Sequence, residues 1–112
     1  MALPHPLPPD LADSLADRFR LLSEPTRLRL LDLLRDGERS VGQLTAELGC
    51  TQANTSKQLA LMADAGVLVR RRDGLHCFYS VADASVYALC DVMCEALRRH
   101  WDARAGTLRP SA

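Results

Sequence analysis

The feature that most constrains this chain is a pair of short helical patterns joined by a tight turn between residues 40 and 66. The first pattern, SVGQLTAELG, begins with Ser40, which is suited to cap a helix, and closes at Gly49. The second, QANTSKQLALMADAG, follows Thr51, which can cap it in the same way. Two helices joined by about three residues, the second polar on its outward side, are typical of a helix-turn-helix.

Two further helical patterns precede this pair. Residues 10–22 carry apolar side chains at spacings of four, four and three, which gives one helical stripe. The proline at position 25 breaks this pattern and suits the first turn of a second helix. We expect that helix, PTRLRLLDLLRDG, to stop at Gly37.

After Gly66 the pattern changes from helix to strand. The segment VLVRRRDGLHCFYSV contains two short β-type runs around Asp73-Gly74, a dipeptide typical of a hairpin turn. From Asp83 a helical period returns in DASVYALCDVMCEALRRHW. The sequence therefore predicts a mainly α fold with a β-hairpin wing, in the order α-α-α-α-β-β-α, which is a winged helix-turn-helix.

Length and composition indicate a single domain of ordinary globular make-up. The chain has 112 residues, of which 47% are hydrophobic, and we expect residues 10–104 to form one folded domain. Four prolines within residues 1–9 predict a flexible amino-terminal arm. Residues 105–112 are expected to form a flexible tail.

The sequence predicts a cytoplasmic protein with no membrane partner. No apolar run approaches the roughly 18 residues of a membrane span, and the amino terminus lacks an apolar secretory core. In that compartment the four cysteines should be reduced thiols. Fourteen basic and fourteen acidic residues cancel, so bulk charge does not favour nucleic acid and only local patches can.

Polar side chains at the start of the second helix of the pair predict contacts with DNA. Thr55, Leu59 and Met62 share the face that should pack on the core. Amides facing outward can bond to adenine edges, hydroxyls can bond to bases or phosphates, and a helix amino terminus favours phosphate. The candidate DNA-binding residues here are Thr51, Gln52, Asn54, Ser56 and Lys57. A solvated helix face is the alternative interpretation.

The predicted wing adds three consecutive basic residues. Arg70, Arg71 and Arg72 lie beside the hairpin turn, where they could contact a neighbouring DNA backbone or minor groove. A solvated run of charge is the alternative. The wing and the helix spacing together favour DNA binding.

The stretches LSEPTRLRLLDLL and SVGQLTAELGCTQANTSKQLALMADAGVLVRRRDGLHCFYSV resemble the ArsR/SmtB-type winged-helix repressors, over about residues 10–100. The resemblance implies a homodimer joined through its first and last helices. Such a dimer binds an operator near its own promoter and leaves it when an inducer binds. The resemblance also implies a reading helix at residues 51–65, with contact positions at Gln52, Ser56 and Lys57. A dimer doubles the local contacts, which offsets the neutral net charge.

The resemblance does not set the inducer, because the ligand sites that we recognise in the family are incomplete here. The positions that match its metal sites at the third and last helices hold Ser40, Gly42, Asp83, Ser85, Ala96 and Arg99. The cysteines of its cadmium and persulfide types would fall near Leu61, Ala65 and Asp32. The inducer site must therefore be sought among the cysteines that this chain does have.

Cys90 and Cys94 are one helical turn apart, so both sulfurs should project from one face of the last helix. Two thiolates can share a soft ion, with As(III) and Sb(III) favoured over Cd(II) and Pb(II), and Cys77 is the candidate third metal ligand. A cysteine of the other protomer is the alternative third ligand, and a redox or persulfide response of the same thiols is the alternative chemistry. Cysteine also serves as a small buried hydrophobe, which is our interpretation of Cys50.

Other classes of function are less favoured. An enzyme is not expected, because the sequence has no Cys-x-x-Cys motif and no glycine loop suited to phosphate, and no organic cofactor is predicted. A winged-helix module that binds only protein, without an inducer, is a further alternative. We therefore expect a transcriptional repressor that binds double-stranded operator DNA as a homodimer.

Overall fold

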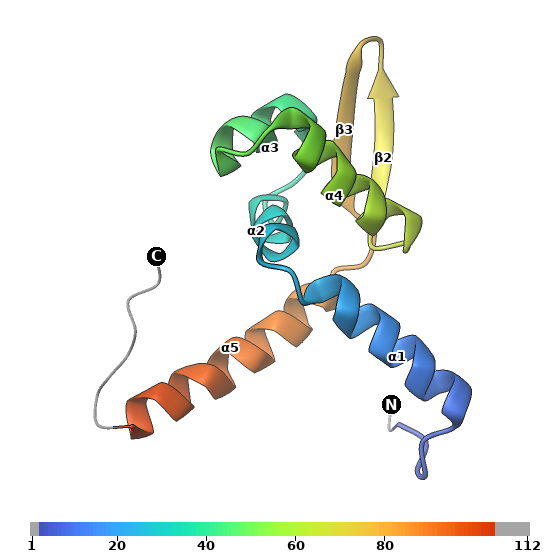
Figure 1. Cartoon of the computed structure of the whole chain (residues 1–112), viewed down its shortest axis with the longest axis vertical. Coiled ribbons are helices and arrows are strands. Elements are labelled where there is room, and N and C mark those ends of the chain that lie inside the picture. Colours follow the sequence, from blue (N-terminus) through green and yellow to red (C-terminus); the bar gives the residue numbers. More distant parts are fainter. Residues whose placement is uncertain (1–2, 105–112) are drawn as a thin grey trace. The chain divides into compact units, whose positions relative to one another are not determined.

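The computed structural model describes residues 3–104, which fall into two compact units that divide after Ala82. The described elements of the amino-terminal unit are α1 (Pro9–Leu22), α2 (Pro25–Leu33), β1 (Arg39–Ser40), α3 (Val41–Leu48), α4 (Gln52–Asp64), β2 (Leu68–Asp73) and β3 (His76–Val81). The carboxy-terminal unit contains α5 (Ser85–Ala103). Figure 1 labels these elements. The predicted order of helices and hairpin is confirmed, with one strand added.

The predicted caps position the two helices of the helix-turn-helix. At the start of α3 the Ser40 hydroxyl accepts the Gln43 N–H at 3.1 Å, and the Gln43 side chain accepts the Ser40 N–H at 2.9 Å. At the start of α4 the Thr51 hydroxyl accepts the Asn54 N–H at 3.1 Å. Gly49 closes α3 with φ 71°, a left-handed conformation that favours glycine. The predicted turn of three residues is confirmed.

The second helix ends earlier than expected. α2 stops at Leu33, ahead of the predicted stop at Gly37. The Leu34 N–H is shared between the carbonyls of Leu30 and Leu31, at 3.0 and 3.2 Å. The Gly37 N–H then bonds the Leu34 carbonyl at 3.2 Å, three residues back. The helix therefore tightens into a turn before it reaches the glycine.

The described residues include most of the predicted amino-terminal arm but none of the predicted carboxy-terminal tail. α1 begins at Pro9, a residue that the predicted arm included, because a proline at the first helical position loses no helical hydrogen bond. Residues 105–112, the predicted tail, lie outside the described residues. The domain bounds of 10–104 stay a prediction.

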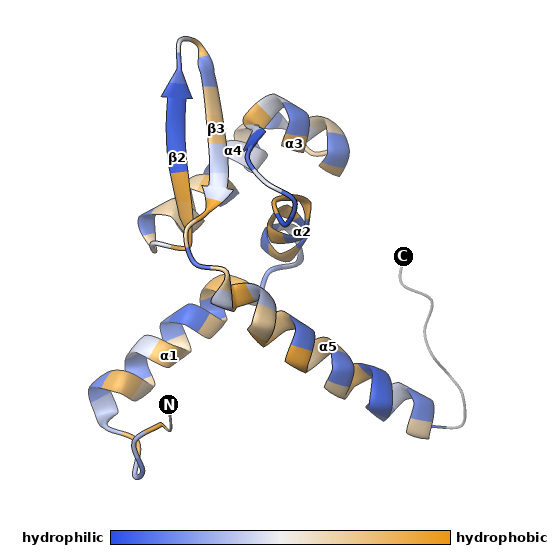
Figure 2. Ribbon diagram, turned by 180° about the vertical axis from the view of Figure 1, so that it is seen from behind, coloured by the Kyte–Doolittle hydropathy of each residue, from blue (hydrophilic) through white to orange (hydrophobic). Residues whose placement is uncertain are grey.

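The predicted hairpin is present. β2 pairs antiparallel with β3 along its whole length, from Leu68 opposite Val81 to Asp73 opposite His76. Gly74 in the turn has φ 60°, which favours glycine there. Figure 2 shows β2 as mostly hydrophilic with a hydrophobic base.

β1, the short strand before α3, was not predicted from the sequence. Arg39 and Ser40 pair with Tyr79 and Phe78 of β3, which gives a three-stranded sheet in the order β1-β3-β2. A strand of two residues is too short to produce an alternating pattern, so periodicity alone could not reveal it. It places β3 at the centre of the sheet.

The core of the amino-terminal unit lies where α2, α3, α4 and the base of the hairpin pack together. Thr55, Leu59 and Met62 of α4 are fully buried at 0% exposure, as predicted. The Thr55 hydroxyl donates to the Thr51 carbonyl at 3.0 Å, so its burial is compensated. The other elements contribute Leu30, Leu31, Leu34, Leu44, Val67, Leu68 and Tyr79. The opposite face of α4 is therefore the face left to solvent.

α5 carries an exposed apolar stripe. Its exposed large hydrophobic residues are Leu89, Val92, Met93 and Leu97, which are between 37% and 70% exposed. Figure 2 shows hydrophobic and hydrophilic residues alternating along this helix. Among the described helices, none is long and apolar enough to span a bilayer. A stripe of this kind is a surface suited to a protein partner.

The buried face of α4 predicts a contrast in stability. Leu59→Ala should lower the free energy of unfolding by about 2–5 kcal/mol, because it removes fully buried atoms and leaves a cavity. Leu61→Ala is the matched control: Leu61 lies on the same helix but is 42% exposed, and its loss should be at most about 1 kcal/mol. Urea unfolding followed by circular dichroism measures both. Equal losses would mean that the inner face of α4 is misassigned.

Candidate nucleic-acid interface

The amino-terminal half of α4 presents a polar face to solvent. Gln52, Asn54 and Lys57 are exposed and Ser56 is half-buried. These residues surround the first turn of the helix, where backbone N–H groups lack helical partners and favour an anion. Four of the five residues predicted on this helix therefore lie together at one exposed end, with Thr51 as the cap.

These side chains differ in whether they form hydrogen bonds or ion pairs within the protein. Within residues 3–104 we find no hydrogen bond or ion pair for the side chains of Gln52, Ser56 and Lys57. The Asn54 side chain is restrained, because its Oδ1 accepts a hydrogen bond from Gln58 Nε2 at 3.1 Å. Thr51 uses its hydroxyl oxygen as the cap of α4. Gln52, Ser56 and Lys57 are thus free to reach an external partner.

Arg27 of α2 links α1 and α4. Its Nη1 donates to Gln58 Oε1 at 2.7 Å, and its Nε donates to the Leu21 carbonyl at the end of α1 at 2.5 Å. The backbone N–H of Arg27 donates to the Glu24 carboxylate at 3.1 Å. Sequence reasoning missed Arg27 and Gln58, since they are 31 positions apart and no local pattern connects them.

Arg18 provides a second link between α1 and α4. Its Nη2 donates to the Ala65 carbonyl at 3.2 Å, at the carboxyl end of α4. Such a carbonyl has no helical partner, so a guanidinium is a favourable donor for it. α4 is therefore joined to α1 near its carboxyl end as well as through Arg27.

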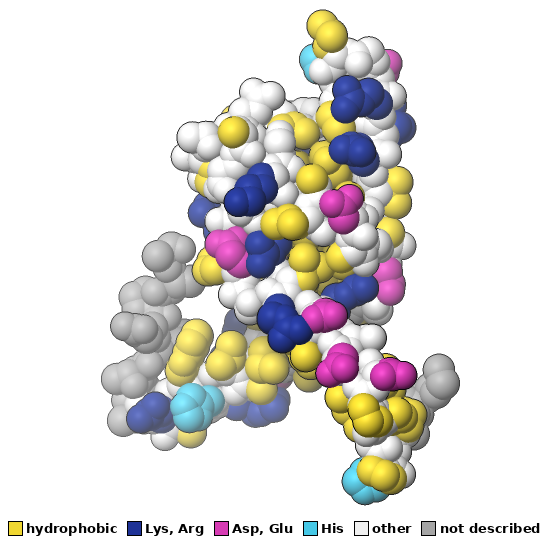
Figure 3. Space-filling view, turned by 45° about the vertical axis from the view of Figure 1, so that its right-hand side comes forward, with side chains coloured by type: hydrophobic (Ala, Val, Ile, Leu, Met, Phe, Trp, Pro, Cys, Tyr) yellow, Lys and Arg dark blue, Asp and Glu magenta, His cyan; other side chains and the backbone are white. Residues whose placement is uncertain are grey.

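The three wing arginines do not share one face of the sheet. All three are exposed, and Figure 3 shows basic side chains gathered on the hairpin. By strand alternation Arg70 and Arg72 lie on the face that carries Tyr79, whereas Arg71 lies on the face that carries Phe78. The predicted basic run is therefore divided between two sides of the wing.

Arg71 is engaged within the protein. Its Nε and Nη2 donate to the two carboxylate oxygens of Glu38 at 3.0 and 2.7 Å, and its guanidinium lies 4.5 Å from the centroid of the Phe78 ring. Phe78 is on β3, the strand between Arg71 on β2 and the β1 side of the sheet, so Arg71 reaches across the central strand. The pair ties the wing to the segment that leads into α3.

The remaining two arginines are less restrained. Arg70 forms a hydrogen bond with the Tyr79 hydroxyl. Burial raises the pKa of that hydroxyl above its ordinary value, and the bond with Arg70 opposes the shift. For Arg72 we find no hydrogen bond or ion pair among the described residues. Arg72 is thus the wing arginine with the greatest freedom to meet an external anion.

The Glu38–Arg71 pair shifts both ionisation equilibria toward the charged forms. The Arg71 guanidinium donates to the carboxylate and thereby lowers the pKa of Glu38 below its ordinary value, although partial burial opposes the shift. The same hydrogen bonds raise the pKa of Arg71. The pair is partly exposed, with Arg71 50% and Glu38 36% accessible, so salt should weaken it.

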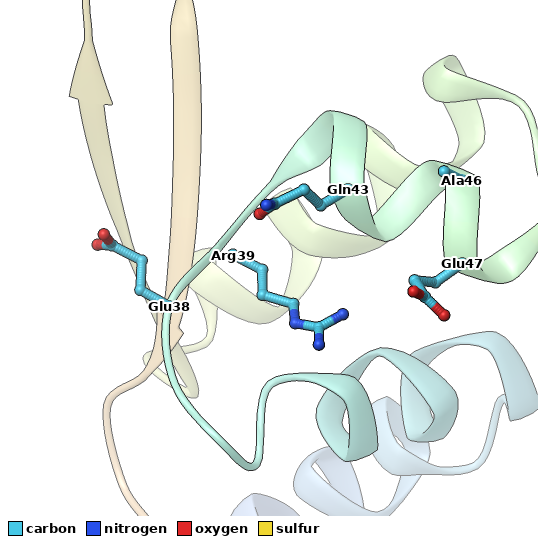
Figure 4. Close-up of a pocket in the computed structure, with 5 residues that line it drawn as sticks. All are labelled: Glu38, Arg39, Gln43, Ala46 and Glu47. Carbon is cyan, nitrogen blue, oxygen red and sulfur yellow. The ribbon is translucent and has the colours of Figure 1, made fainter.

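An open hollow lies beside this pair. Glu38, Arg39, Gln43, Ala46 and Glu47 line it, and Figure 4 shows Glu38 pointing toward the hairpin and Arg39 pointing to the other side. This opposition follows from the alternation of side chains along an extended segment. The lining is charged and polar, unlike the mostly apolar walls of ordinary small-molecule sites.

The candidate ligand cysteines are divided between the two units. Cys90, half-buried, and Cys94, exposed, are one turn apart on α5, while Cys77 is half-buried on β3. Cys50, which we interpreted as structural, is half-buried in the turn before α4. Among residues 3–104 no group of three or more His, Cys, Asp or Glu side chains is arranged to hold a metal ion. Helical spacing alone thus brings Cys90 and Cys94 together, and the role of Cys77 stays a prediction.

Known proteins resemble this chain in both sequence and fold. Residues 22–71 match a family model described as a helix-turn-helix domain. The HTH-type transcriptional regulator Rv0081 of Mycobacterium tuberculosis is 37% identical over 94 residues, which cover 83% of this chain and 82% of the relative. The crystal structure of Rv0081 matches with a TM-score of 0.76 at 36% identity, covering 85% of this chain and 96% of that one.

Two further solved structures are similar over most of the chain. One is the homodimeric winged helix-turn-helix DNA-binding domain of Mb0332 from Mycobacterium bovis, with 30% identity, a TM-score of 0.70, and coverage of 85% of this chain and 91% of that one. The other is the antimony-specific transcriptional repressor AntR, with 28% identity, a TM-score of 0.77, and coverage of 87% and 88%. Each is described as a DNA-binding domain or a repressor, and none as an enzyme.

The Glu38–Arg71 pair predicts a pH dependence of the wing. Because the folded-state pKa of Glu38 lies below its ordinary value of 4.5, its contribution to stability is present above that value and is lost as the pH falls through the lowered pKa. Protection of β3 amide N–H groups against hydrogen exchange, corrected for the intrinsic effect of pH, should fall in that range.

Two variants serve as controls for this pH dependence. Glu38→Gln should abolish the step, because it removes the titrating carboxylate. Glu47→Gln, which changes a carboxylate on the same hollow, should keep it. A step of equal size in the Glu38→Gln protein would assign the titration to another group.

Proposed function

The chain belongs to the ArsR/SmtB-type family of winged helix-turn-helix transcriptional repressors, and we propose that it binds operator DNA as a homodimer through α4 and the wing. The observation that carries the proposal is the exposed polar end of α4, which lies opposite the buried Thr55, Leu59 and Met62. A helix packed in this way can enter a major groove without disturbing the core. The same unit continues into the hairpin that forms the wing.

The unengaged side chains suit the chemistry of DNA. The Gln52 amide can pair with an adenine edge, and the Ser56 hydroxyl can reach a base or a phosphate. Lys57 supplies a positive charge, and Thr51 and Asn54 complete the predicted set on the helix. Arg70 and Arg72 would meet the phosphate backbone or minor groove beside it. Arg71, bound to Glu38, would hold the wing in place while adding positive potential.

The proposed dimer seam uses α1 and α5. On α5 the apolar residues Val92 and Met93 are 70% and 56% exposed, and on α1 Phe19 is 51% exposed. Covering such side chains with a second copy removes apolar surface from water. Val86 of α5 is buried in the protomer, so a charge that tests the seam is better placed at the exposed Val92. Two reading helices would then face half-sites about one DNA turn apart.

DNA binding should depend on named side chains in two different ways. Gln52→Ala and Ser56→Ala should each weaken operator binding by about 1–3 kcal/mol per half-site and relax base preference, because they remove contacts to base edges. Arg72→Ala should weaken binding to all sequences alike and flatten the dependence of affinity on salt, because it removes a phosphate contact. Fluorescence anisotropy with the DNA upstream of the gene, over a range of salt concentrations, measures both effects.

Asp64→Ala is the matched control for this experiment. Asp64 is exposed at the carboxyl end of the same helix, away from the polar end, and its replacement should not reduce affinity. Wild-type affinity and base preference in both the Gln52 and Ser56 variants would show that another surface reads the DNA. A protein that binds no upstream DNA at all would favour the alternative of a protein-only module.

The proposed inducer is a soft metal or metalloid ion held by Cys90 and Cys94. The two thiols are one turn apart on α5, and Cys94 is exposed, so an ion can reach them. Thiolates prefer soft ions, which favours As(III) and Sb(III) over Cd(II) and Pb(II). The likeness to a repressor described as antimony-specific supports the same choice. Cys77 or a cysteine of the other protomer would supply the third ligand.

Binding at α5 would act on DNA through the proposed seam. An ion held by the last helix would shift that helix or the wing strand and change the separation of the two reading helices. Specific binding weakens when that separation no longer matches the half-sites. The alternative uses the same thiols in a redox or persulfide response, although cysteines at this spacing on one helix strain a direct disulfide.

The sensor proposal predicts the loss of induced release in two variants. In wild type, arsenite or antimonite should release operator DNA, and in Cys90→Ser and Cys94→Ser it should not, because each change removes a thiolate ligand. Anisotropy measures release, and ultraviolet thiolate-to-metal bands separate ion binding from a persulfide response. Cys50→Ser is the matched control and should respond like wild type. If both α5 variants responded like wild type, the pair would be structural.

A further inference from the structure

We infer that Arg27, acting through Gln58, fixes which end of the Asn54 side-chain amide faces outward, so that Asn54 reads hydrogen-bond acceptors on DNA. The inference rests on the proposed function, since it assigns an orientation to one of the proposed contact residues. It makes Arg27 and Gln58 positioning residues for recognition. Neither was identified from the sequence.

The orientation of the Gln58 amide follows from its contact with Arg27. A guanidinium carries only donors, whereas an amide offers an oxygen at one end and an NH₂ group at the other. Arg27 Nη1 lies 2.7 Å from the Gln58 side chain, so the atom that faces it must be Oε1. The Arg27 guanidinium is itself held by the Leu21 carbonyl, which accepts from its Nε at 2.5 Å. The orientation of Gln58 is therefore set by chemistry, even though the two ends of an amide have nearly the same shape.

Gln58 in turn orients Asn54, which lies one helical turn closer to the amino terminus of α4. With Oε1 committed to Arg27, Gln58 presents its Nε2 donor to Asn54. The Asn54 atom 3.1 Å away must then accept, which makes it Oδ1. The reverse orientation would bring two NH₂ groups together without an acceptor between them. Asn54 Nδ2 is thus directed away from Gln58, on an exposed residue.

The orientation of the Asn54 amide restricts which base edges it can recognise. An outward NH₂ group suits acceptors in the major groove, which are guanine O6 and N7, adenine N7 and thymine O4. Bidentate pairing with adenine requires the amide oxygen and nitrogen to face the base together, whereas here Gln58 Nε2 occupies one of the two lone pairs of the oxygen and holds that end of the amide toward Gln58. Gln52 carries the same amide group without such a restraint and can turn either end outward. Asn54 should therefore prefer acceptors, and Gln52 supplies the adaptable contact.

The critical variant is Gln58→Glu. A carboxylate still accepts the hydrogen bond from Arg27 but offers no donor to Asn54. The Asn54 amide should then turn, donate from Nδ2 to the new carboxylate, and present Oδ1 to the groove. Base preference at the contacted position should change from guanine or thymine, which present only acceptors, to cytosine, which presents only a donor. The added negative charge weakens binding to every sequence, so the ratio of affinities between sites is the informative quantity.

The experiment selects sites from randomised double-stranded DNA with the full chain and then measures the affinity ratio for the two best bases at each position. In wild type the acceptor-bearing base should be favoured about tenfold or more at one position per half-site. Gln58→Glu should invert that preference, and Gln58→Ala, which frees the amide, should reduce it without inverting it. Asn54→Ala should abolish it in either background. Circular dichroism melting confirms that each variant is folded.

The outcomes separate the inference from the function on which it rests. Failure of wild type to bind any selected DNA would overturn the proposed function. Binding with a preference that Asn54→Ala leaves unchanged would overturn only the base contact of Asn54, and with it the inference. A preference that depends on Asn54 but stays unchanged in both Gln58 variants would show that the Arg27–Gln58 chain merely joins α2 to α4. Inversion in Gln58→Glu would support the proposal, because a purely structural role cannot reverse a base preference.

Discussion

The packing of α4 against the core determines what the rest of the molecule can present. Thr55, Leu59 and Met62 are fully buried beneath this helix, which sets its rotation about its own axis. A helix rotated by one residue would turn by about 100° and would exchange polar for apolar side chains at its surface. The polar end of α4 is exposed because these three side chains are not. Loss of this packing would therefore remove the whole polar surface of α4, and not only one contact with DNA.

Local signals were sufficient to predict the elements, and distant pairings were not. Ser40, Thr51 and Gly49 mark the ends of α3 and α4 because a cap acts on backbone groups within a few residues of itself. The second strand of the wing was predictable for the same reason, from its alternation and the turn at Gly74. β1 was missed because it exists only by pairing with β3, a partner far along the chain.

The same limit applies to the candidate site. Composition at residues 51–57 was enough to predict the exposed polar end of α4, but not which of its side chains are restrained. Arg71 reads as one of three equivalent arginines in the sequence, yet its partner Glu38 is 33 positions away. That pairing depends on the strand order, which places Phe78 between the two. The sequence shows which polar side chains are present, but only the fold shows which of them are not already paired within the protein and can contact DNA.

The guanidinium groups of Arg18, Arg27 and Arg71 all donate hydrogen bonds within the amino-terminal unit. The first two join α1 to α4, near its carboxyl end and at Gln58. Under the proposed function α1 belongs to the dimer seam, so movement of α1 would reach the reading helix through two hydrogen-bonded links. Arg18 and Arg27 would then help to determine where the reading helices are placed when they meet DNA.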